Sequence, residues 1–216
     1  MPTDHITENA TKAGDALGRV QKLRKLALAI GGLAAGILMV FSGSRAPSGT
    51  LLHEAIEYLG ILLIFACIAG RLWSSLYIAG RKKVELIQDG PYEISRNPLY
   101  LFSLLGAAGV GAATGSVTGI ILASFVCFSV FSIVILMEEQ FLRQRFGAAF
   151  DAYCACTPRL FPRTFHMTAR SEITIDPRLI MRNFRDSSLF LLAIPMIELI
   201  EEMQEAGLLP IYFIVP

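Results

Sequence analysis

The chain has 216 residues, of which 54% are hydrophobic and only 17% are charged, and its mean hydropathy is +0.55. Soluble domains hold fewer apolar and more charged residues, so the composition indicates a polytopic membrane protein. The formal net charge of +1 argues against a nucleic-acid partner, because no surplus of lysine and arginine is present to neutralise phosphates. The polar first twenty residues lack the apolar stretch of a signal peptide.

Five apolar runs are candidates for membrane-spanning helices, each of which takes about 20 residues. In chain order they are Leu23 to Phe41, Leu51 to Tyr77, Leu99 to Ala113, Val117 to Met137 and Leu189 to Met203. The third run is short, and Gly115 and Ser116 predict a tight turn that joins it to the fourth as a helical hairpin. Glutamates and a proline interrupt the fifth run, so we expect a tilted or partly interfacial helix there.

Lysine and arginine gather before the first run, after the second, and between the fourth and the fifth, whereas loops 42–50 and 114–116 hold only Arg45. Positive residues favour the cytoplasmic side of a membrane, so we expect a cytoplasmic N-terminus and an external C-terminus. The predicted organisation is a polar N-terminus over 1–22, a membrane core over 23–163, and a C-terminal extension over 164–216 that holds the fifth helix.

Two polar motifs flank the predicted hairpin. The first, GPYEISRNPLY, covers residues 90–100, and the second, EEQFLRQRFGAAFDAYCACTPRLFPR, covers residues 138–163. Because little more than a membrane hairpin connects them, both should emerge at the same cytoplasmic face and form a site there.

Charged residues of the two motifs have a binding and a structural interpretation. Arg96 offers a planar fork that suits a carboxylate, although an arginine beside a tyrosine is also typical of a membrane interface. Glu138 and Glu139 are expected to end the fourth helix, where acids oppose the macrodipole, so a binding role would explain them. Ordinary surface pairs with Arg143 and Arg145 are the structural alternative.

Other polar residues point less clearly to a site. His53 and Glu57 occupy the ends of a five-residue motif like that of zinc proteases, but Glu57 stands where the second histidine would be. Three glutamates of the fifth run reach the same predicted outer face: Glu198, Glu201 and Glu202. The two acidic groups can meet there, but we expect solvated residues near helix ends. Cys154 and Cys156 lack a second ligand cluster, so no metal or redox centre is predicted.

The two motifs resemble those of the isoprenylcysteine carboxyl methyltransferase and phospholipid methyltransferase superfamily of membrane enzymes. Its pattern reads roughly G-P-Y-x-x-x-R-H-P-x-Y, a membrane hairpin, E-E-x-x-L-x-x-x-F-G-x-x-Y-x-x-Y, and a short P-R-x-x-P. The first part is matched by Gly90, Pro91, Tyr92, Arg96, Pro98 and Tyr100. The second part is matched by Glu138, Glu139, Leu142, Phe146, Gly147, Tyr153, Pro158, Arg159 and Pro162. The resemblance covers residues 70–163, with Phe150 in place of a tyrosine and Asn97 in place of the histidine.

The resemblance implies an all-α fold and S-adenosyl-L-methionine as the cofactor, bound in a pocket at the cytoplasmic ends of the core helices. The implied cofactor-binding residues are Tyr92, Arg96, Asn97, Pro98, Tyr100, Glu138, Glu139 and Phe146. For an acceptor carboxylate, Arg159 is the first candidate partner and Arg143 the second, whereas Glu139 is the candidate base for an amine or thiol. We expect Asn97 to position the cofactor, because an amide forms hydrogen bonds but does not titrate near neutral pH.

We therefore predict an integral-membrane, S-adenosyl-L-methionine-dependent methyltransferase of the bacterial inner membrane. The acceptor that the resemblance implies first is the carboxylate of an isoprenylcysteine-like lipid, which arrives from the bilayer. The alternatives are N-methylation of a phospholipid amine, S-methylation of a small thiol, and a non-catalytic membrane scaffold that retains the fold. Asn97 is the residue that favours the scaffold.

Overall fold

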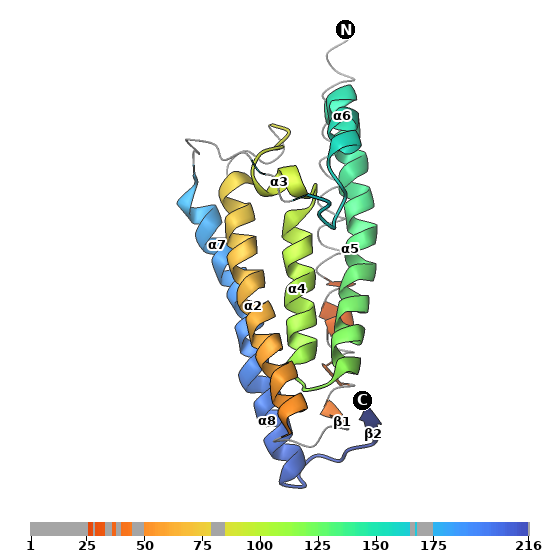
Figure 1. Ribbon diagram of the computed structural model, residues 1–216, viewed down its shortest axis with the longest axis vertical. Helices are drawn as coiled ribbons and strands as arrows, with labels where there is room; N and C mark the ends of the chain where they lie inside the picture. Colours follow the sequence, from red (N-terminus) through yellow and green to blue (C-terminus); the bar gives the residue numbers. More distant parts are fainter. Residues whose placement is uncertain are drawn as a thin grey trace.

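A computed structural model describes residues 26–27, 29–32, 36–37, 40–44, 50–78, 85–164, 167 and 175–215. Its elements are β1 (Ser42–Ser44), α2 (Leu51–Ile78), α3 (Pro91–Ile94), α4 (Pro98–Ala112), α5 (Val117–Phe146), α6 (Ala148–Cys156), α7 (Pro177–Ser188), the 3-10 turn Leu189–Leu192, α8 (Ala193–Glu205) and β2 (Phe213–Val215). The long helices run side by side as an elongated bundle, with α3 and α6 at one end and the two strands at the other (Figure 1).

Helix α4 lies between α2 and α5 and packs along both. Glycines allow these backbones to approach closely, as in many membrane helix pairs. A Cβ atom at Gly60 of α2 would lie 2.7 Å from the amide nitrogen of Ala113, and one at Gly111 of α4 would lie 2.3 Å from the carbonyl oxygen of Gly119. Ser116 begins α5 by accepting a hydrogen bond from the amide of Gly119. The predicted hairpin of the third and fourth runs is therefore confirmed.

Two of the described helices, α2 and α5, are long and apolar enough to cross a membrane, with 28 and 30 residues. Helix α4 is apolar but has 15 residues, and its rise of about 22 Å is less than the roughly 30 Å of a bilayer's hydrocarbon core. Nine of the 19 residues of the first predicted span, Leu23 to Phe41, lie outside the described residues. The number of five spans therefore stays a prediction.

Helix α5 differs from the prediction at its C-terminal end. It continues to Phe146 instead of ending near Met137, so Glu138 and Glu139 lie inside the helix, about two turns before its end. The segment after Met137 is rich in Glu, Gln, Leu and Arg, which are strong helix formers, and it stops where Gly147 adopts a positive φ of 53°. The expectation that the two acids end the helix and oppose its macrodipole was therefore wrong.

The C-terminal extension holds more structure than one apolar helix. Asp176 caps α7 by accepting a hydrogen bond from the amide of Arg178, with Pro177 at the first helical position. Helix α7 packs along α2, and the chain continues through the 3-10 turn into α8 (Figure 1). Pro195 lies in the first turn of α8, where a missing N–H costs little. The expected fifth helix, Leu189 to Met203, thus consists of the 3-10 turn and most of α8.

Among the residues that the structure describes, one short strand pair accompanies the helices, and the sequence did not predict it. β1 and β2 pair in parallel, with Ser42 opposite Phe213 and Ser44 opposite Val215. The side-chain amide of Gln204 also donates to the carbonyl oxygen of Val40 at 2.8 Å. The end of the chain is therefore tied to the segment that precedes α2.

Candidate active site

A buried carboxylate joins the two sequence motifs at the α3–α6 end of the bundle. The side chain of Glu139 is 6% exposed, and its Oε1 lies 3.3 Å from Nε of Arg96. Its Oε2 lies 3.0 Å from Nη2 of Arg159. Two guanidinium groups therefore compensate for the desolvation of this carboxylate, which would be costly without partners. The prediction that the two motifs meet is confirmed.

Asn97, in the place of the family's histidine, connects the same groups. Its Nδ2 donates to the main-chain oxygen of Arg159 at 3.0 Å and lies 3.5 Å from Oε1 of Glu139. The side chain thus holds the segment after α6 against the start of α4. These contacts support the positioning role expected for Asn97, which stays a prediction.

Local backbone chemistry fixes the first motif. Gly90 has a positive φ of 58°, and a Cβ atom there would lie 2.4 Å from the ring of Tyr77, so only glycine fits. Pro91 and Pro98 begin α3 and α4, where their fixed φ suits the first helical position. Between them, the amide of Arg96 donates to the carbonyl oxygen of Pro158 at 2.9 Å. The motif is thereby clamped to the second one through its main chain.

A second clamp joins α6 to α3. The hydroxyl of Tyr153 donates to the carbonyl oxygen of Tyr92 at 2.6 Å, and both side chains are buried. Burial raises the pKa of both phenols well above their usual range, and the neighbouring Tyr153 and Glu138 add to the rise at Tyr92. Both hydroxyls are therefore protonated donors at neutral pH.

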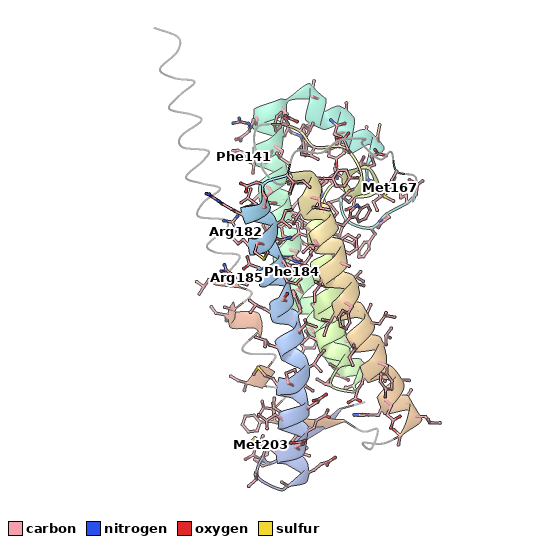
Figure 2. All side chains as sticks on the ribbon, turned by 90° about the vertical axis from the view of Figure 1, so that its left-hand side faces the viewer. Phe141, Met167, Arg182, Phe184, Arg185 and Met203 are labelled. Carbon is pink, nitrogen blue, oxygen red and sulfur yellow. The ribbon has the colours of Figure 1, made fainter. Side chains whose placement is uncertain are left out.

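A cavity of about 1170 Å³ opens beside these motifs. The lining includes most of the predicted cofactor-binding residues: Tyr92, Arg96, Asn97, Pro98, Tyr100, Glu138 and Glu139. Phe141 of α5 and Arg182 of α7 also line it, and Figure 2 shows both toward the upper end of the molecule. The volume exceeds the roughly 300–1,000 Å³ of ordinary ligand pockets, so the cavity has room for more than one small molecule.

Two buried polar atoms of cavity-lining residues have no hydrogen-bond or ion-pair partner within the described ranges, Tyr92 Oη and Glu138 Oε1. A third, Arg96 Nε, makes no hydrogen bond but lies in the ion pair with Glu139. An unsatisfied buried group costs about 1–3 kcal/mol, and more when it is charged. The two unpartnered atoms are a neutral donor and an anionic acceptor, and the guanidinium of Arg96 beside them is cationic. A ligand that carries both an anionic group and hydrogen-bond donors would satisfy them.

Three predicted site residues are not among those that line the cavity. Arg143 is 55% exposed, and its Nε lies 2.7 Å from Oδ1 of Asp151. Arg159 is 52% exposed and reaches Glu139. The guanidinium of Arg145 lies 5.9 Å from the centre of the Phe146 ring. The roles of Arg143 and Arg159 toward an acceptor, and of Phe146 toward a cofactor, stay predictions.

A polar network around Arg71 of α2 lines the same cavity and was missed by the sequence analysis. Its Nε donates to Oγ of Ser187 at 2.8 Å and its Nη2 to Oδ1 of Asn183 at 3.1 Å, and Nη1 donates to Ser103. Asn183 in turn donates to the carbonyl oxygen of Arg71 at 3.1 Å. An arginine inside an apolar run is a functional candidate by default, and that signal was present in the sequence.

The fold and the paired motifs define a membrane protein of the phospholipid methyltransferase type. The model of the phospholipid methyltransferase family matches residues 51–149, and the chain belongs to this family. The resemblance on which the sequence analysis relied is thereby confirmed.

Two relatives cover most of the chain. The cobalt-zinc-cadmium resistance protein CzcN of Cupriavidus metallidurans is 36% identical over 173 residues, which cover 79% of this chain and 78% of that protein. The nickel-cobalt-cadmium resistance protein NccN of Alcaligenes xylosoxydans xylosoxydans is 31% identical over 180 residues, which cover 83% and 84%. No solved structure matches the chain significantly.

Proposed function

We propose that the chain is an S-adenosyl-L-methionine-dependent methyltransferase whose active site is the cavity beside Glu139, at the cytoplasmic face of a five-span membrane domain. The observation that carries the proposal is the pair of buried, unpartnered atoms at that cavity, on Tyr92 and Glu138, beside the guanidinium of Arg96. When bound, the cofactor supplies an electrophilic methyl group on a sulfonium. The residues of the chain bind, orient and desolvate the reactants.

The lining residues fit the polar groups of this cofactor. Arg96 offers a guanidinium for the carboxylate, and Glu138 offers an acceptor for the ammonium or for ribose hydroxyls. The aromatic faces of Tyr92 and Tyr100, which line the same cavity, suit a sulfonium cation. Glu139 is already engaged by Arg96 and Arg159, so its proposed role is to hold Arg96 in place.

The acceptor that we propose first is a carboxylate on an isoprenylcysteine-like lipid. Apolar side chains of α4 and α5, including Val110, Val126 and Phe131, line part of the cavity and suit a lipid tail. Arg71 supplies a cation beside them for the acid group. A carboxylate acceptor has no proton to lose, so the site needs mainly to hold it in line with the methyl group and to keep water away.

Methylation of a phospholipid amine is the alternative that the family's description favours. An ammonium headgroup must lose a proton before it attacks, so this reaction needs a base. Glu138 fits that task better than Glu139, because its Oε1 is unpartnered within the described part of the chain whereas both oxygens of Glu139 face guanidinium groups. Methylation of a small thiol would need the same base.

The physiological role that we propose is a contribution to resistance against divalent transition metals, because both relatives are named for such resistance. A cell that carries the chain should then tolerate more cobalt or cadmium than one that carries the Glu138→Gln variant. Growth inhibition by each metal tests whether the candidate active site contributes to resistance. Equal inhibition of both strains would remove metal resistance but leave the methyltransferase proposal intact.

Binding of the cofactor is the first test. The purified protein in detergent or nanodiscs is titrated with S-adenosyl-L-methionine by calorimetry, and we expect saturable binding. If protein that still unfolds cooperatively does not bind the cofactor at millimolar concentration, the methyltransferase proposal is wrong and the non-catalytic membrane scaffold is the alternative that remains.

The acceptor is identified with cofactor labelled in its methyl group. The protein is incubated with this cofactor together with a lipid extract or a farnesylcysteine analogue. We expect the label in a base-labile ester. Label in a base-stable N-methyl lipid would instead select the phospholipid amine.

A further inference from the structure

At the end of the bundle opposite the candidate active site, polar side chains of α2 and α8 converge. His53 and Glu57 lie in the first two turns of α2, and Nε2 of His53 lies 3.1 Å from Oε1 of Glu57. Glu201 of α8 joins them, so that one possible ligand atom from each of the three residues lies within 4.8 Å of the others. Figure 1 shows the start of α2 beside α8, and Figure 2 shows Met203 of α8 far from Phe141.

The imidazole of His53 is held firmly in this cluster. The residue is 4% exposed, and its Nδ1 has no hydrogen-bond partner in the residues that the structure describes. A Cβ atom at Gly115 would lie 2.0 Å from Cε1 of His53, so the ring occupies space that only a glycine leaves at the α4–α5 turn. Thr50 accepts a hydrogen bond from the amide of His53 at 3.4 Å and thereby caps α2.

Among the described residues, no lysine or arginine balances the carboxylates of the cluster. Glu57 and Glu201 are both half-buried, and within the described ranges neither carboxylate contacts a lysine or an arginine. Glu198 and Glu205 of α8 add further negative charge near Glu201. Like charges brought together in a partly desolvated place repel each other, so the arrangement calls for a cation.

We propose that His53, Glu57 and Glu201 bind one divalent metal ion of the zinc and cobalt class. An imidazole nitrogen with two carboxylate oxygens is a ligand set that suits these ions, whereas calcium and magnesium prefer oxygen ligands alone. Bonds of about 2.0–2.2 Å place ligand atoms roughly 3–4 Å apart. The present spread of up to 4.8 Å closes by small side-chain rotations, and water completes the coordination.

The proposed ion would connect two parts of the chain. His53 and Glu57 belong to the region that the family model matches, whereas Glu201 belongs to the C-terminal extension outside that region. The ligand that the His53–Glu57 motif lacks in sequence is thus supplied by a helix far away in the chain. Metal binding would fasten α8 to the start of α2, a task separate from methyl transfer.

Direct titration with Co²⁺ and Zn²⁺ tests the site. The full chain is purified through an affinity tag without histidine, stripped with a chelator, and titrated with Co²⁺ while its visible absorption is recorded. We expect one saturable site, displacement of Co²⁺ by Zn²⁺, and a higher unfolding temperature with metal bound. Absence of saturable binding at millimolar Co²⁺ or Zn²⁺ would overturn the proposal.

Matched glutamate variants locate the ion. Glu201→Gln should weaken Co²⁺ binding at least tenfold, while Glu202→Gln removes the same charge from the next, exposed position and should leave the affinity within about twofold. Equal losses of Co²⁺ affinity in the two variants would show that only the overall negative charge of α8 attracts the ion, which would overturn the proposed site. His53→Gln should remove the visible absorption band of bound Co²⁺. Because His53 is buried, this substitution can also disturb the fold, so Glu201→Gln at a half-buried position is the variant that keeps the fold.

A comparison of cations tests the proposed class. Ca²⁺ and Mg²⁺ should not displace Co²⁺ at equal concentration. Displacement by either would contradict the assignment to zinc-like ions.

Discussion

Glu138 and Glu139 are neighbours in sequence, but their surroundings differ completely. Oε1 of Glu138 is buried without a partner in the described part of the chain, whereas Glu139 faces Arg96 and Arg159. The carboxylate of Glu138 therefore lowers the stability of the ligand-free protein and is available to a ligand, whereas that of Glu139 stabilises the fold. This division is the physical basis for assigning cofactor binding to Glu138 and support of the site to Glu139.

Glutamine substitutions at the two positions should have opposite effects. Glu138→Gln should reduce cofactor affinity roughly 10- to 100-fold, because a hydrogen bond to a charged group contributes about 1.5–3 kcal/mol, and it should leave the unfolding temperature unchanged or higher. Glu139→Gln leaves two guanidinium groups without their carboxylate and should cost about 3–5 kcal/mol. Calorimetry and thermal unfolding measure both effects. A lower unfolding temperature for Glu138→Gln than for Glu139→Gln would contradict the assignment.

Asn97 connects Glu139 to the main chain of Arg159 by hydrogen bonds alone. If positioning is its role, Asn97→Ala should lower methyl-transfer activity mainly by weakening cofactor binding, without a new pH dependence. Asn97→His should restore activity above pH 7, where a histidine is largely neutral. The pH profile of kcat/KM for the three proteins checks this. A variant Asn97→His that surpasses the natural chain by orders of magnitude would show that the family's histidine acts as an acid or base.

At the scale of elements, α3 and α6 are too short to be stable alone and depend on their mutual clamp. Tyr153→Phe removes the 2.6 Å hydrogen bond to the carbonyl oxygen of Tyr92 and should destabilise the protein by about 1 kcal/mol at neutral pH.

The same clamp predicts a response to high pH. Burial raises the pKa of Tyr153 above that of a phenol in the unfolded chain, which is about 10. Its contribution to stability is therefore complete below pH 10 and is lost as the pH rises above that value. Thermal unfolding between pH 8 and pH 11 should show a smaller alkaline loss for Tyr153→Phe than for the natural chain. Identical pH slopes would mean that Tyr153 does not contribute.

The hairpin and the ends of the bundle at which polar groups meet were predicted from the sequence, whereas the length of α5 and the strand pair were not. The turn at Gly115 and Ser116 brought the two motifs to one end, as expected from their hairpin connection. The length of α5 was missed because apolar character marks a membrane core but not the end of a helix, which Gly147 determines. The pairing of Ser42 with Phe213 was missed because it joins residues more than a hundred positions apart. The meeting of Glu201 with His53 and Glu57 agrees with the predicted outer face that these residues share.

For the whole molecule, the positive residues predict an orientation in the membrane that thiol labelling can measure. The chain carries its own probe, because Cys156 is exposed at the end of the bundle that holds the candidate active site, while Cys67 and Cys127 are buried. A membrane-impermeant thiol reagent should label Cys156 only after the cells are opened. The variant Leu208→Cys, at a position that is 70% exposed beyond α8, should instead be labelled in intact spheroplasts when Cys154 and Cys156 are replaced by serine. Labelling of Cys156 from outside would invert the topology and place the proposed cofactor pocket on the side of the membrane where the cell does not supply S-adenosyl-L-methionine.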